Sequence, residues 1–334
     1  MKLATYKDGS RDGQLVVVSR DLATAHYATG IASKLQQVLD DWNFMSPQLQ
    51  DLYQMLDSGK ARHAFPFDPT RCMAPLPRAC QWASSSAFTH HLELACQARH
   101  AEAPPTLLTA PCMYQGSGSA FIGPCDEVLV ADEAWDIDFE AGVAVITGDI
   151  PRGAGPGQAL DGIRLVMLAN EVSLRQLMAD EGAQGSGFVQ GKPTTAFSPV
   201  AVTTDELVFG GDSIWKGGRL HLSLQSSWNG RKVGMCDAGA DMTFDFGQLL
   251  AHLCKTRPVK AGSVIGSGPV SNRDASLGYS CIADKRALET LADGAPKTAF
   301  MKFGDTLRIE AKGKDGQSVF GAIDQKMVSW AQVE

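Results

Sequence analysis

The stretch WDIDFEAGVAVITGD, residues 135–149, joins a row of carboxylates to a strongly apolar run. Asp138 and Glu140 alternate with apolar residues, and the row stops at Gly142. Because side chains on a strand alternate between its two faces, all three positions should point to the same side. Carboxylates at the start of a buried strand need a positive partner, and a hard metal ion is one candidate. The stretch therefore predicts a buried strand at a metal site or at the remains of one.

Composition excludes several classes of protein. The 334 residues are 44% apolar and 20% charged, which is typical of a globular protein with a real core. The net charge of −7 argues against nucleic acid or an anionic membrane as the main partner. No apolar stretch approaches the roughly 20 residues that span a bilayer, and the polar opening MKLATYKDGSRDG is unlike a signal peptide. Eight cysteines without a CxxC pair predict reduced core thiols in a cytoplasmic protein.

The chain divides into two predicted domains near residue 74. Residues 1–74 read as a small α/β domain, in which the strands KLATYK and QLVVVS flank a hairpin turn and helices follow at about 30–41 and 46–58. The second helix should open on Ser46, with Pro47 at its first position. The proline-rich segment 64–79 reads as an extended linker.

The larger predicted domain, residues 75–334, is mostly β. Short strands separated by Gly, Asp and Asn turns dominate it, and they do not alternate with helices as in a doubly wound fold. The glycine-rich stretches 116–123 and 153–162 lack the strand–helix context of a nucleotide loop, so we read both as surface turns and expect no nucleotide cofactor. Helices are predicted at four places: 86–99, 171–180, 245–254 and 284–292.

Four further stretches carry residue types suited to chemistry. QWASSSAFTHHLELACQARH (81–100) puts His91 beside an apolar helical stripe, where it is either a satisfied core histidine or a catalytic base. As a base, it should be oriented by a carboxylate, for which we expect Glu140 or Glu93. MLANEVSLRQL (167–177) puts Glu171 at a predicted helix start with Arg175 one turn later. GFVQGKPTTAFSPVAV (187–202) puts Lys192 in a loop before a strand, and APCMYQGSGSAFIGP (110–124) puts Tyr114 at the end of an apolar segment.

Together with residues 135–149, these stretches resemble the fumarylacetoacetate hydrolase family from about Pro75 to the C-terminus. MKFGDTLRIE (301–310) is similar to the penultimate strand of that family, and the N-terminal stretch is similar to the small domain of its longer, homogentisate-pathway members. The resemblance implies an α+β, mostly β fold, in which a mixed β-sheet roll follows a small N-terminal α/β domain. It also implies a cytoplasmic homodimer that works in aromatic catabolism.

The chemistry of the family explains these residue types. Its hydrolases cleave a carbon–carbon bond beside a 1,3-dicarbonyl group, and a divalent metal stabilises the enolate that forms. The resemblance implies Mg²⁺ or Ca²⁺ held by four carboxylates, a histidine that deprotonates water, and cationic and phenolic groups that hold an anionic diketo acid. It assigns catalytic roles to His91, Lys192 and Glu140, substrate contacts to Tyr114, Arg175 and Arg99, and metal contacts to Glu140 and Glu171.

This chain departs from the family pattern at the predicted metal site. Ser84 stands where the family has an aspartate, Gly142 where it has its second glutamate, and Glu171 where it has an aspartate. Pro269 replaces a threonine that contacts the substrate. Since hard divalent ions are held largely by ligand charge, we predict that tight metal binding is lost and that the double change Ser84→Asp with Gly142→Glu would restore it.

Three functions therefore compete. The first is hydrolysis of a carbon–carbon bond in a 2,4-diketo acid, such as an acylpyruvate or a fumarylacetoacetate-like compound, with a weakened metal site. The second is a metal-independent tautomerase, decarboxylase or lyase that uses His91 with Lys192 and Arg175. The third is a catalytically silent paralogue that binds a ligand or a partner.

Overall fold

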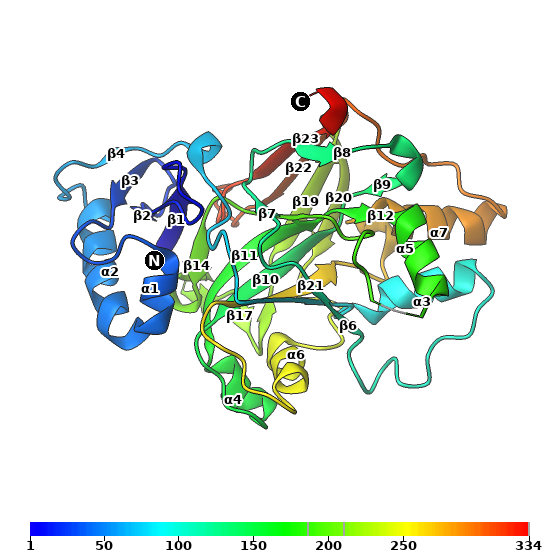
Figure 1. Cartoon of the computed structure of the whole chain (residues 1–334), viewed down its shortest axis with the longest axis horizontal. Coiled ribbons are helices and arrows are strands. Elements are labelled where there is room, and N and C mark those ends of the chain that lie inside the picture. Colours follow the sequence, from blue (N-terminus) through cyan, green and yellow to red (C-terminus); the bar gives the residue numbers. More distant parts are fainter. Residues whose placement is uncertain (186, 210, 333–334) are drawn as a thin grey trace.

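The computed structural model describes residues 1–185, 187–209 and 211–332. The N-terminal unit is an antiparallel sheet packed against two helices, α1 (Leu35–Asp40) and α2 (Trp42–Asp57), at the left of Figure 1. The strands are β1 (Lys2–Tyr6), β2 (Gln14–Val18), β3 (Thr24–Tyr27) and β4 (Phe65–Pro66). The predicted hairpin is present, since β1 pairs with β2 from Lys2 opposite Val18 to Tyr6 opposite Gln14.

The predicted start of the second helix was wrong. Helix α2 begins at Trp42, and Pro47 lies inside it. Trp42 and Met45 pack against the apolar core of this unit, which favours helix upstream of the proline. Pro47 is the sixth residue of α2, beyond the first four amides that lack an intrahelical partner, so it removes one i to i−4 hydrogen bond that the apolar contacts of the helix must offset.

The sheet of the N-terminal unit continues into the larger domain. Strand β1 pairs with β14, placing Lys2 opposite Val202 and Leu3 opposite Ala201. From there the sheet runs through β14 (Ala201–Thr203), β11 (Ile163–Glu171), β10 (Ala141–Thr147), β21 (Ser263–Pro269), β5 (Gln81–Ser85) and β6 (Met113–Gly116), with β13 (Thr195–Phe197) and β7 (Phe121–Ile122) off this path. The two predicted domains thus share one sheet.

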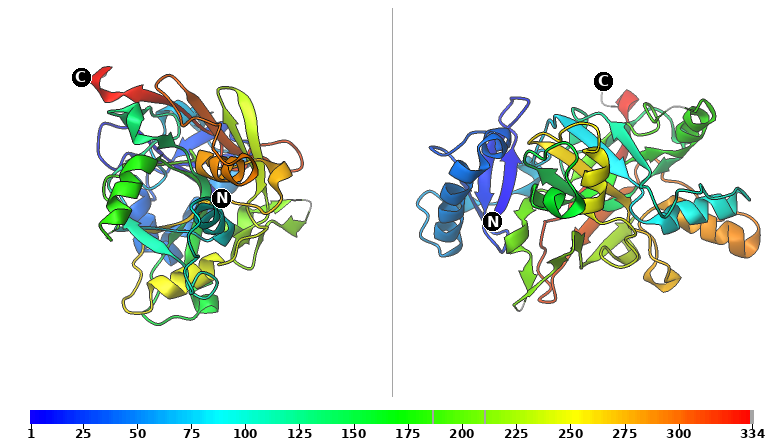
Figure 2. Two further views of the ribbon diagram at one scale, coloured as in Figure 1. Left: turned by 90° about the vertical axis from the view of Figure 1, so that its right-hand side faces the viewer. Right: turned by 90° about the horizontal axis from the view of Figure 1, so that it is seen from below.

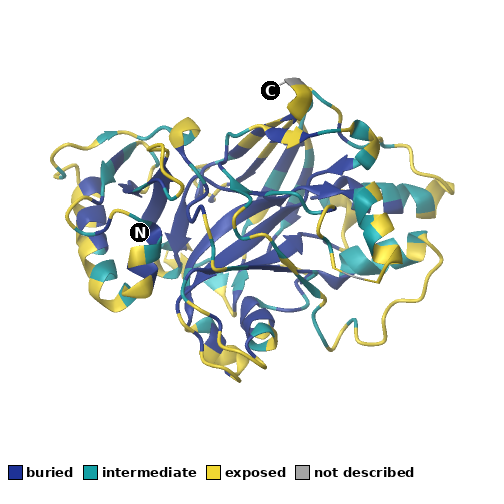
Figure 3. Ribbon diagram, viewed as in Figure 1, coloured by how far each residue is buried: buried dark blue, intermediate teal, exposed yellow. Residues whose placement is uncertain are grey.

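A second, five-stranded sheet completes a roll, and Figure 2 (left) shows the roll end-on. Its strands are β20 (Arg231–Asp237), β19 (Ser223–Trp228), β22 (Thr306–Ala311), β23 (Ile323–Ser329) and β8 (Val128–Val130). Three small pairs accompany it: β9 (Ile137–Asp138) with β12 (Ser173–Leu174), β15 (Val208–Phe209) with β16 (Asp212–Ser213), and β17 (Trp215–Lys216) with β18 (Arg219–Leu220). Every residue of β10 is buried, as its apolar run predicts, and the central strands are dark in Figure 3.

Three helices gather at the right-hand end of Figure 1: α3 (Thr89–Ala98), α5 (Arg175–Ala183) and α7 (Ile282–Asp293). Helices α4 (Pro156–Leu160) and α6 (Phe246–Leu253) lie below the roll, and α4 occupies part of a stretch that we read as turns. The described residues also form five single 3₁₀ turns: Pro69–Arg71, Glu133–Trp135, Thr204–Glu206, Ala275–Leu277 and Trp330–Gln332. The mostly β, α+β roll predicted from the sequence is confirmed.

Two other expectations from the sequence concern the cysteines and membrane-spanning segments. All eight cysteines are free thiols, but Cys80 and Cys112 are exposed and Cys96 and Cys125 are half-buried, so the expectation of core positions holds only for the other four. Among the described residues, no helix combines the length and the apolarity needed to cross a bilayer.

Candidate active site

The central sheet brings two carboxylates together near the start of helix α5. Glu171 ends strand β11 and does not begin a helix as predicted, because its apolar neighbours continue the buried strand pairing and α5 starts only at Arg175. Glu140 immediately precedes β10, and the Glu171 amide donates to its carbonyl oxygen at 2.9 Å. Both side chains are buried. The pairing of β10 with β11 therefore builds a buried pair of acids.

Glu140 is held by two cations and a hydroxyl group. An Arg175 guanidinium nitrogen lies 2.8 Å from Oε1, and the Lys192 Nζ lies 2.7 Å from Oε2. The Ser173 hydroxyl donates to Oε1 at 2.8 Å and accepts from Lys192 at 2.7 Å. Burial acts to raise the pKa of Glu140, but Lys192 and Arg175 outweigh it and lower that pKa to about 2. Glu140 is thus an anion whose charge is already neutralised within the protein.

Arg175 also joins the strand to helix α7. Its Nε donates to Asp138 at 2.8 Å, and Asp138 in turn accepts from the backbone amides of Ile282 at 2.7 Å and Ala283 at 3.0 Å. These amides belong to the first turn of α7, where unpaired N–H groups favour an anion. Asp138 therefore anchors α7 against the site.

Glu171 faces a phenol and a neutral hydroxyl group. The Tyr114 hydroxyl donates to Oε2 of Glu171 at 2.9 Å, while Oε1 of Glu171 and Oγ of Ser84 are buried without a hydrogen-bond partner among the described residues. Burial raises the pKa of Glu171 and that of Tyr114. The Lys192 Nζ lies 5.6 Å from the centre of the Tyr114 ring, and Phe188 packs edge-on against the same ring at 5.8 Å.

His91 pairs with a carboxylate that sequence reasoning missed. Its Nδ1 lies 2.5 Å from Oδ1 of Asp284, and the Ser271 hydroxyl donates to Oδ2 of the same carboxylate at 2.7 Å. Burial acts to raise the pKa of Asp284, but the neighbouring His91 outweighs it, and the pKa lies below its usual value. We expected Glu140 or Glu93 as the partner. A carboxylate partner is present, but the expected identity was wrong, because Glu140 pairs with Arg175 and Lys192.

Glu93 is also engaged elsewhere, since its carboxylate lies 2.9 Å from the Arg273 guanidinium. Asp284 is 193 positions from His91 and becomes its neighbour only through the packing of α7 on α3. A histidine two residues into a helix carries no local signal for so distant a partner. Arg99 does not join the cluster, because it is exposed at the C-terminal end of α3.

The residues at the expected metal site do not fit a hard divalent ion. Mg²⁺ and Ca²⁺ require six or more oxygen ligands and substantial negative charge. Of the four expected positions, Glu140 is neutralised by its two cations and Ser84 offers a neutral hydroxyl. Gly142 has no side chain to act as a ligand. The backbone also leaves no room for one, because a Cβ at this position would lie 2.3 Å from the Gly268 carbonyl oxygen.

The closure at position 142 has a local cause in strand β21. Gly142 pairs with Pro269 whereas Ala144 pairs with Gly266, so β21 has one extra residue, a bulge, between these two pairs. Gly268 in this bulge has a φ of 71°, a left-handed conformation that glycine adopts without strain. The bulge therefore fills the space that a side chain at position 142 would need.

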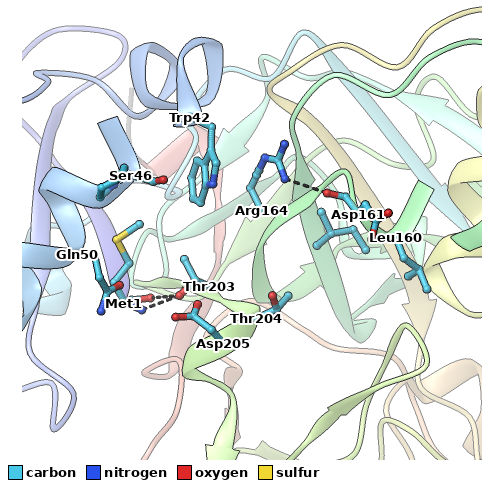
Figure 4. A pocket seen from close by; sticks show the side chains of 12 residues that line it. Met1, Trp42, Ser46, Gln50, Leu160, Asp161, Arg164, Thr203, Thr204 and Asp205 are labelled. Carbon is cyan, nitrogen blue, oxygen red and sulfur yellow. Dashed lines mark hydrogen bonds between the residues drawn. The ribbon is translucent and has the colours of Figure 1, made fainter. Parts of the chain in front are cut away.

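A cavity of about 530 Å³ lies away from this cluster, at the seam between the N-terminal unit and the roll (Figure 4). Arg164 lines it beside Trp42, with its guanidinium 5.7 Å from the ring centre, and donates to the Asp161 carbonyl at 2.9 Å. None of the residues assigned catalytic, substrate or metal roles from the sequence lines this cavity. It is therefore separate from the candidate active site.

Comparison with known proteins places the chain in a family. Residues 1–78 match the model of the fumarylacetoacetase N-terminal domain 2, and residues 80–328 match the fumarylacetoacetate (FAA) hydrolase C-terminal model. The chain thus belongs to the fumarylacetoacetate hydrolase family, whose members include hydrolases and isomerases that act on small acids and generally use a divalent metal.

Individual relatives are distant. A 2,4-didehydro-3-deoxy-L-rhamnonate hydrolase of a Sphingomonas species is 26% identical over 163 residues, which cover 48% of this chain and 53% of that protein. The chain spans between half and two thirds of the length of the curated relatives that it matches.

Two solved structures show the same fold over 98% of this chain, each with a TM-score of 0.65. One is a probable 2-hydroxyhepta-2,4-diene-1,7-dioate isomerase from Mycobacterium abscessus, 18% identical, of which 99% is covered. The other is the maleylpyruvate hydrolase from Sphingobium sp. SYK-6, 14% identical, of which 100% is covered. The family expected from the sequence is confirmed, and its named relatives are enzymes.

Proposed function

We propose that this protein catalyses proton transfer on a 2,4-diketo acid, an isomerisation that needs no divalent ion. The observation that carries the proposal is the contrast between two groups of residues. The His91–Asp284 pair has the geometry of an oriented general base, whereas the expected metal ligands are neutralised, neutral or absent. The homodimer and the cytoplasmic location expected from the resemblance remain predictions.

The base follows from the hydrogen bond to Asp284. With a carboxylate as its partner, Nδ1 of His91 carries the ring proton, and Nε2 keeps a lone pair. No described residue hydrogen-bonds to Nε2 of His91, so it is free to accept a proton. The proton between the two carbonyl groups of a 2,4-diketo acid is acidic, and its removal moves the electron pair onto a carbonyl oxygen.

Donors for that oxygen surround Glu140 and Glu171. Lys192 and Arg175 each hold Glu140, and the Tyr114 hydroxyl holds Glu171. A developing enolate would compete for these donors in a poorly solvated site, where hydrogen bonds to a charge are strong. The protonated His91 then returns its proton to the enolate, so that the isomerisation is complete without net consumption of an acid or a base.

Hydrolysis of a carbon–carbon bond is the second candidate. The retained His91–Asp284 pair favours it, since the same base would activate water. Hydrolysis must also stabilise a carbon leaving group, which is the role that a chelating metal fills in metal-assisted catalysis. The donor set described above does not fit that metal, and this is why we place isomerisation first.

A silent, ligand-binding protein is the third candidate. The side chains of Lys192 and Arg175 are only 7% and 14% exposed, and both already have carboxylate partners. An anionic ligand would have to displace one of these ion pairs. The ion pairs therefore favour a site that stays closed to substrate, as a catalytically silent protein would have.

One experiment separates the three. Incubation of 2,4-dioxopentanoate with the protein in D₂O, followed by proton NMR, reports exchange at carbon 3 and release of pyruvate in the same spectrum. Isomerisation predicts exchange above the spontaneous rate without pyruvate, unchanged by chelator. Hydrolysis predicts pyruvate, and a silent protein predicts neither.

The variants make this test specific to His91. We expect His91→Asn and Asp284→Asn to slow exchange, the first by about a hundred- to ten-thousand-fold, as for loss of a general base. His100→Asn is the matched control, because His100 is exposed and has a φ of 53°, a conformation that asparagine tolerates. Equal exchange by wild type and His91→Asn would refute the assignment of the base.

A further inference from the structure

His91, Asp284 and a third residue, Cys281, form a cluster that the proposed reaction does not use as a unit. Cys281 is the residue before helix α7, Asp284 lies in the first turn of that helix, and His91 comes from α3. One ligand atom from each side chain lies within 4.8 Å of the other two. The Cys281 Sγ is 3.8 Å from Nδ1 of His91, and Cys281 is fully buried.

We propose that His91, Cys281 and Asp284 bind one zinc-class divalent ion, and that this ion silences His91 as a base. The site is distinct from the carboxylate site implied by the family, whose expected positions are Ser84, Glu140, Gly142 and Glu171. The binding part of the proposal stands on geometry alone, and the silencing part rests on the proposed function.

The donor set selects the kind of ion. Imidazole nitrogen, thiolate sulfur and carboxylate oxygen are the ligands that Zn²⁺ takes in proteins, with a water in the fourth position of an open site. Mg²⁺ and Ca²⁺ avoid sulfur and prefer oxygen. The cluster therefore favours Zn²⁺, or Co²⁺ as its spectroscopic substitute, over the ions that the rest of the family pattern implies.

The distances show what must move. Bonds of about 2.0–2.3 Å in a tetrahedral site place neighbouring ligand atoms about 3.3–3.8 Å apart. The separation of 3.8 Å between Sγ of Cys281 and Nδ1 of His91 is already within this range. The 2.5 Å between Nδ1 of His91 and Oδ1 of Asp284 must widen by about 1 Å. Rotation of two side chains on neighbouring helices supplies such a shift without a change of fold.

Binding moves two protons. Cys281 is a free, fully buried thiol in the metal-free protein. The ion bonds to the thiolate and releases that proton to solvent. It also takes the Nδ1 position of His91, and the ring proton moves to Nε2 through solvent. One proton is thus released for each ion, and the complex of one imidazole, one thiolate and one carboxylate with a divalent cation is neutral.

The tautomer explains the silencing. In the free protein Nδ1 carries the proton and Nε2 is the base, as argued above. With the ion on Nδ1, Nε2 carries the proton and has no lone pair left to accept another. Occupancy therefore abolishes proton abstraction, although His91 keeps its place in the fold.

Titration of the full-length, metal-free protein with Co²⁺ tests the site without reference to activity. We expect visible d–d bands of a tetrahedral ion, a near-ultraviolet thiolate-to-cobalt charge-transfer band, release of one proton per ion, and loss of all bands when Zn²⁺ is added. Cys281→Ser should weaken binding by more than about a hundred-fold, because even outer-shell partners of a metal contribute about ten- to a hundred-fold.

Cys254→Ser is the matched control, since Cys254 is an equally buried thiol that contacts the Ala154 and Ala251 carbonyls at the end of α6. Wild-type protein without a charge-transfer band would overturn the site, even if Cys281→Ser fails to fold. Equal Co²⁺ affinity of Cys281→Ser and wild type would overturn it as well.

The silencing is tested separately in the exchange assay. One equivalent of Zn²⁺ should abolish exchange in the wild type, whereas Mg²⁺ at the same concentration should not. Cobalt bands together with full exchange activity in the presence of Zn²⁺ would overturn the silencing. Cobalt bands in a protein that catalyses no exchange would overturn the proposed reaction and support the metal site.

Discussion

Gly142→Ala tests whether strand β21 has closed the position of the missing metal ligand. The added Cβ would meet the Gly268 carbonyl oxygen at 2.3 Å, and ordinary contacts begin near 3.4 Å, so the two strands must part by about 1.1 Å. That movement also pulls on the hydrogen bond from the Val143 amide to the Ser267 hydroxyl, which is 3.1 Å long. The substitution therefore strains backbone on both strands.

The expected magnitude follows from three contributions. Overpacking of a close-packed core costs about 1–3 kcal/mol, and a weakened hydrogen bond costs about 0.5–1.5 kcal/mol. Replacing glycine by alanine restricts the unfolded chain, which returns about 0.4–1 kcal/mol because φ at residue 142 is not left-handed. We expect a net destabilisation of about 0.5–4 kcal/mol, which lowers the midpoint of thermal unfolding.

Urea unfolding followed by tryptophan fluorescence measures this difference at constant temperature. Gly182→Ala is the matched control, because Gly182 lies in helix α5 with no atom within 4 Å of its added Cβ. It should stabilise the protein by up to about 1 kcal/mol. A Gly142→Ala variant as stable as Gly182→Ala would refute the closure. Our sequence-based expectation that Gly142→Glu with Ser84→Asp restores metal binding is untenable if the closure holds.

Tyr114→Phe removes the donor to Glu171 and leaves a second oxygen of this buried carboxyl unpaired, so we expect a loss of about 1–3 kcal/mol in urea unfolding. Glu171→Gln should stabilise the protein at pH 7 but not at pH 4. Burial raises the pKa of Glu171 in the folded protein. The contribution of the protonated side chain to folding stability is therefore fully present below the pKa of an unfolded glutamate, about 4.3, and is lost as the pH rises through the pKa of the folded state. A pH series of melting curves with the sign reversed would contradict this. Millimolar Mg²⁺ should add less than about 0.1 kcal/mol to the free energy of unfolding, as expected when the dissociation constant exceeds the ion concentration about tenfold. A clear rise in melting temperature with Mg²⁺ would refute the conclusion that the carboxylate site does not fit this ion.

Much of the fold was predictable because its signals are local. The hairpin of β1 and β2 is encoded by two β-branched runs and a turn, and β10 by an unbroken apolar run. The first residues of the helices were harder to predict from the sequence. Pro47 is a good first residue of a helix, yet the apolar contacts of Trp42 extend α2 upstream of it. Glu171 was placed on a helix because a carboxylate near an arginine resembles a helix start, but strand pairing continues through it.

The site was predictable only in its residue types. Glu140, Lys192 and Arg175 meet as the resemblance implied, but the sequence does not say that they satisfy one another. The partner of His91 could not be found, since Asp284 lies on another helix and no local pattern links the two. The blocked space at Gly142 depends on a bulge in a strand more than 120 residues away, which no spacing rule describes.

The pairing of β1 with β14 has a consequence for attempts to divide this protein. Strand β14 lies between β1 and β11, so deletion of the N-terminal unit would leave one side of β14 without hydrogen-bonded neighbours. An open strand of this kind is a template for association with other chains. The first domain thus acts as a cover for the sheet edge of the second, and the isolated roll should aggregate even though it retains every residue of the candidate active site.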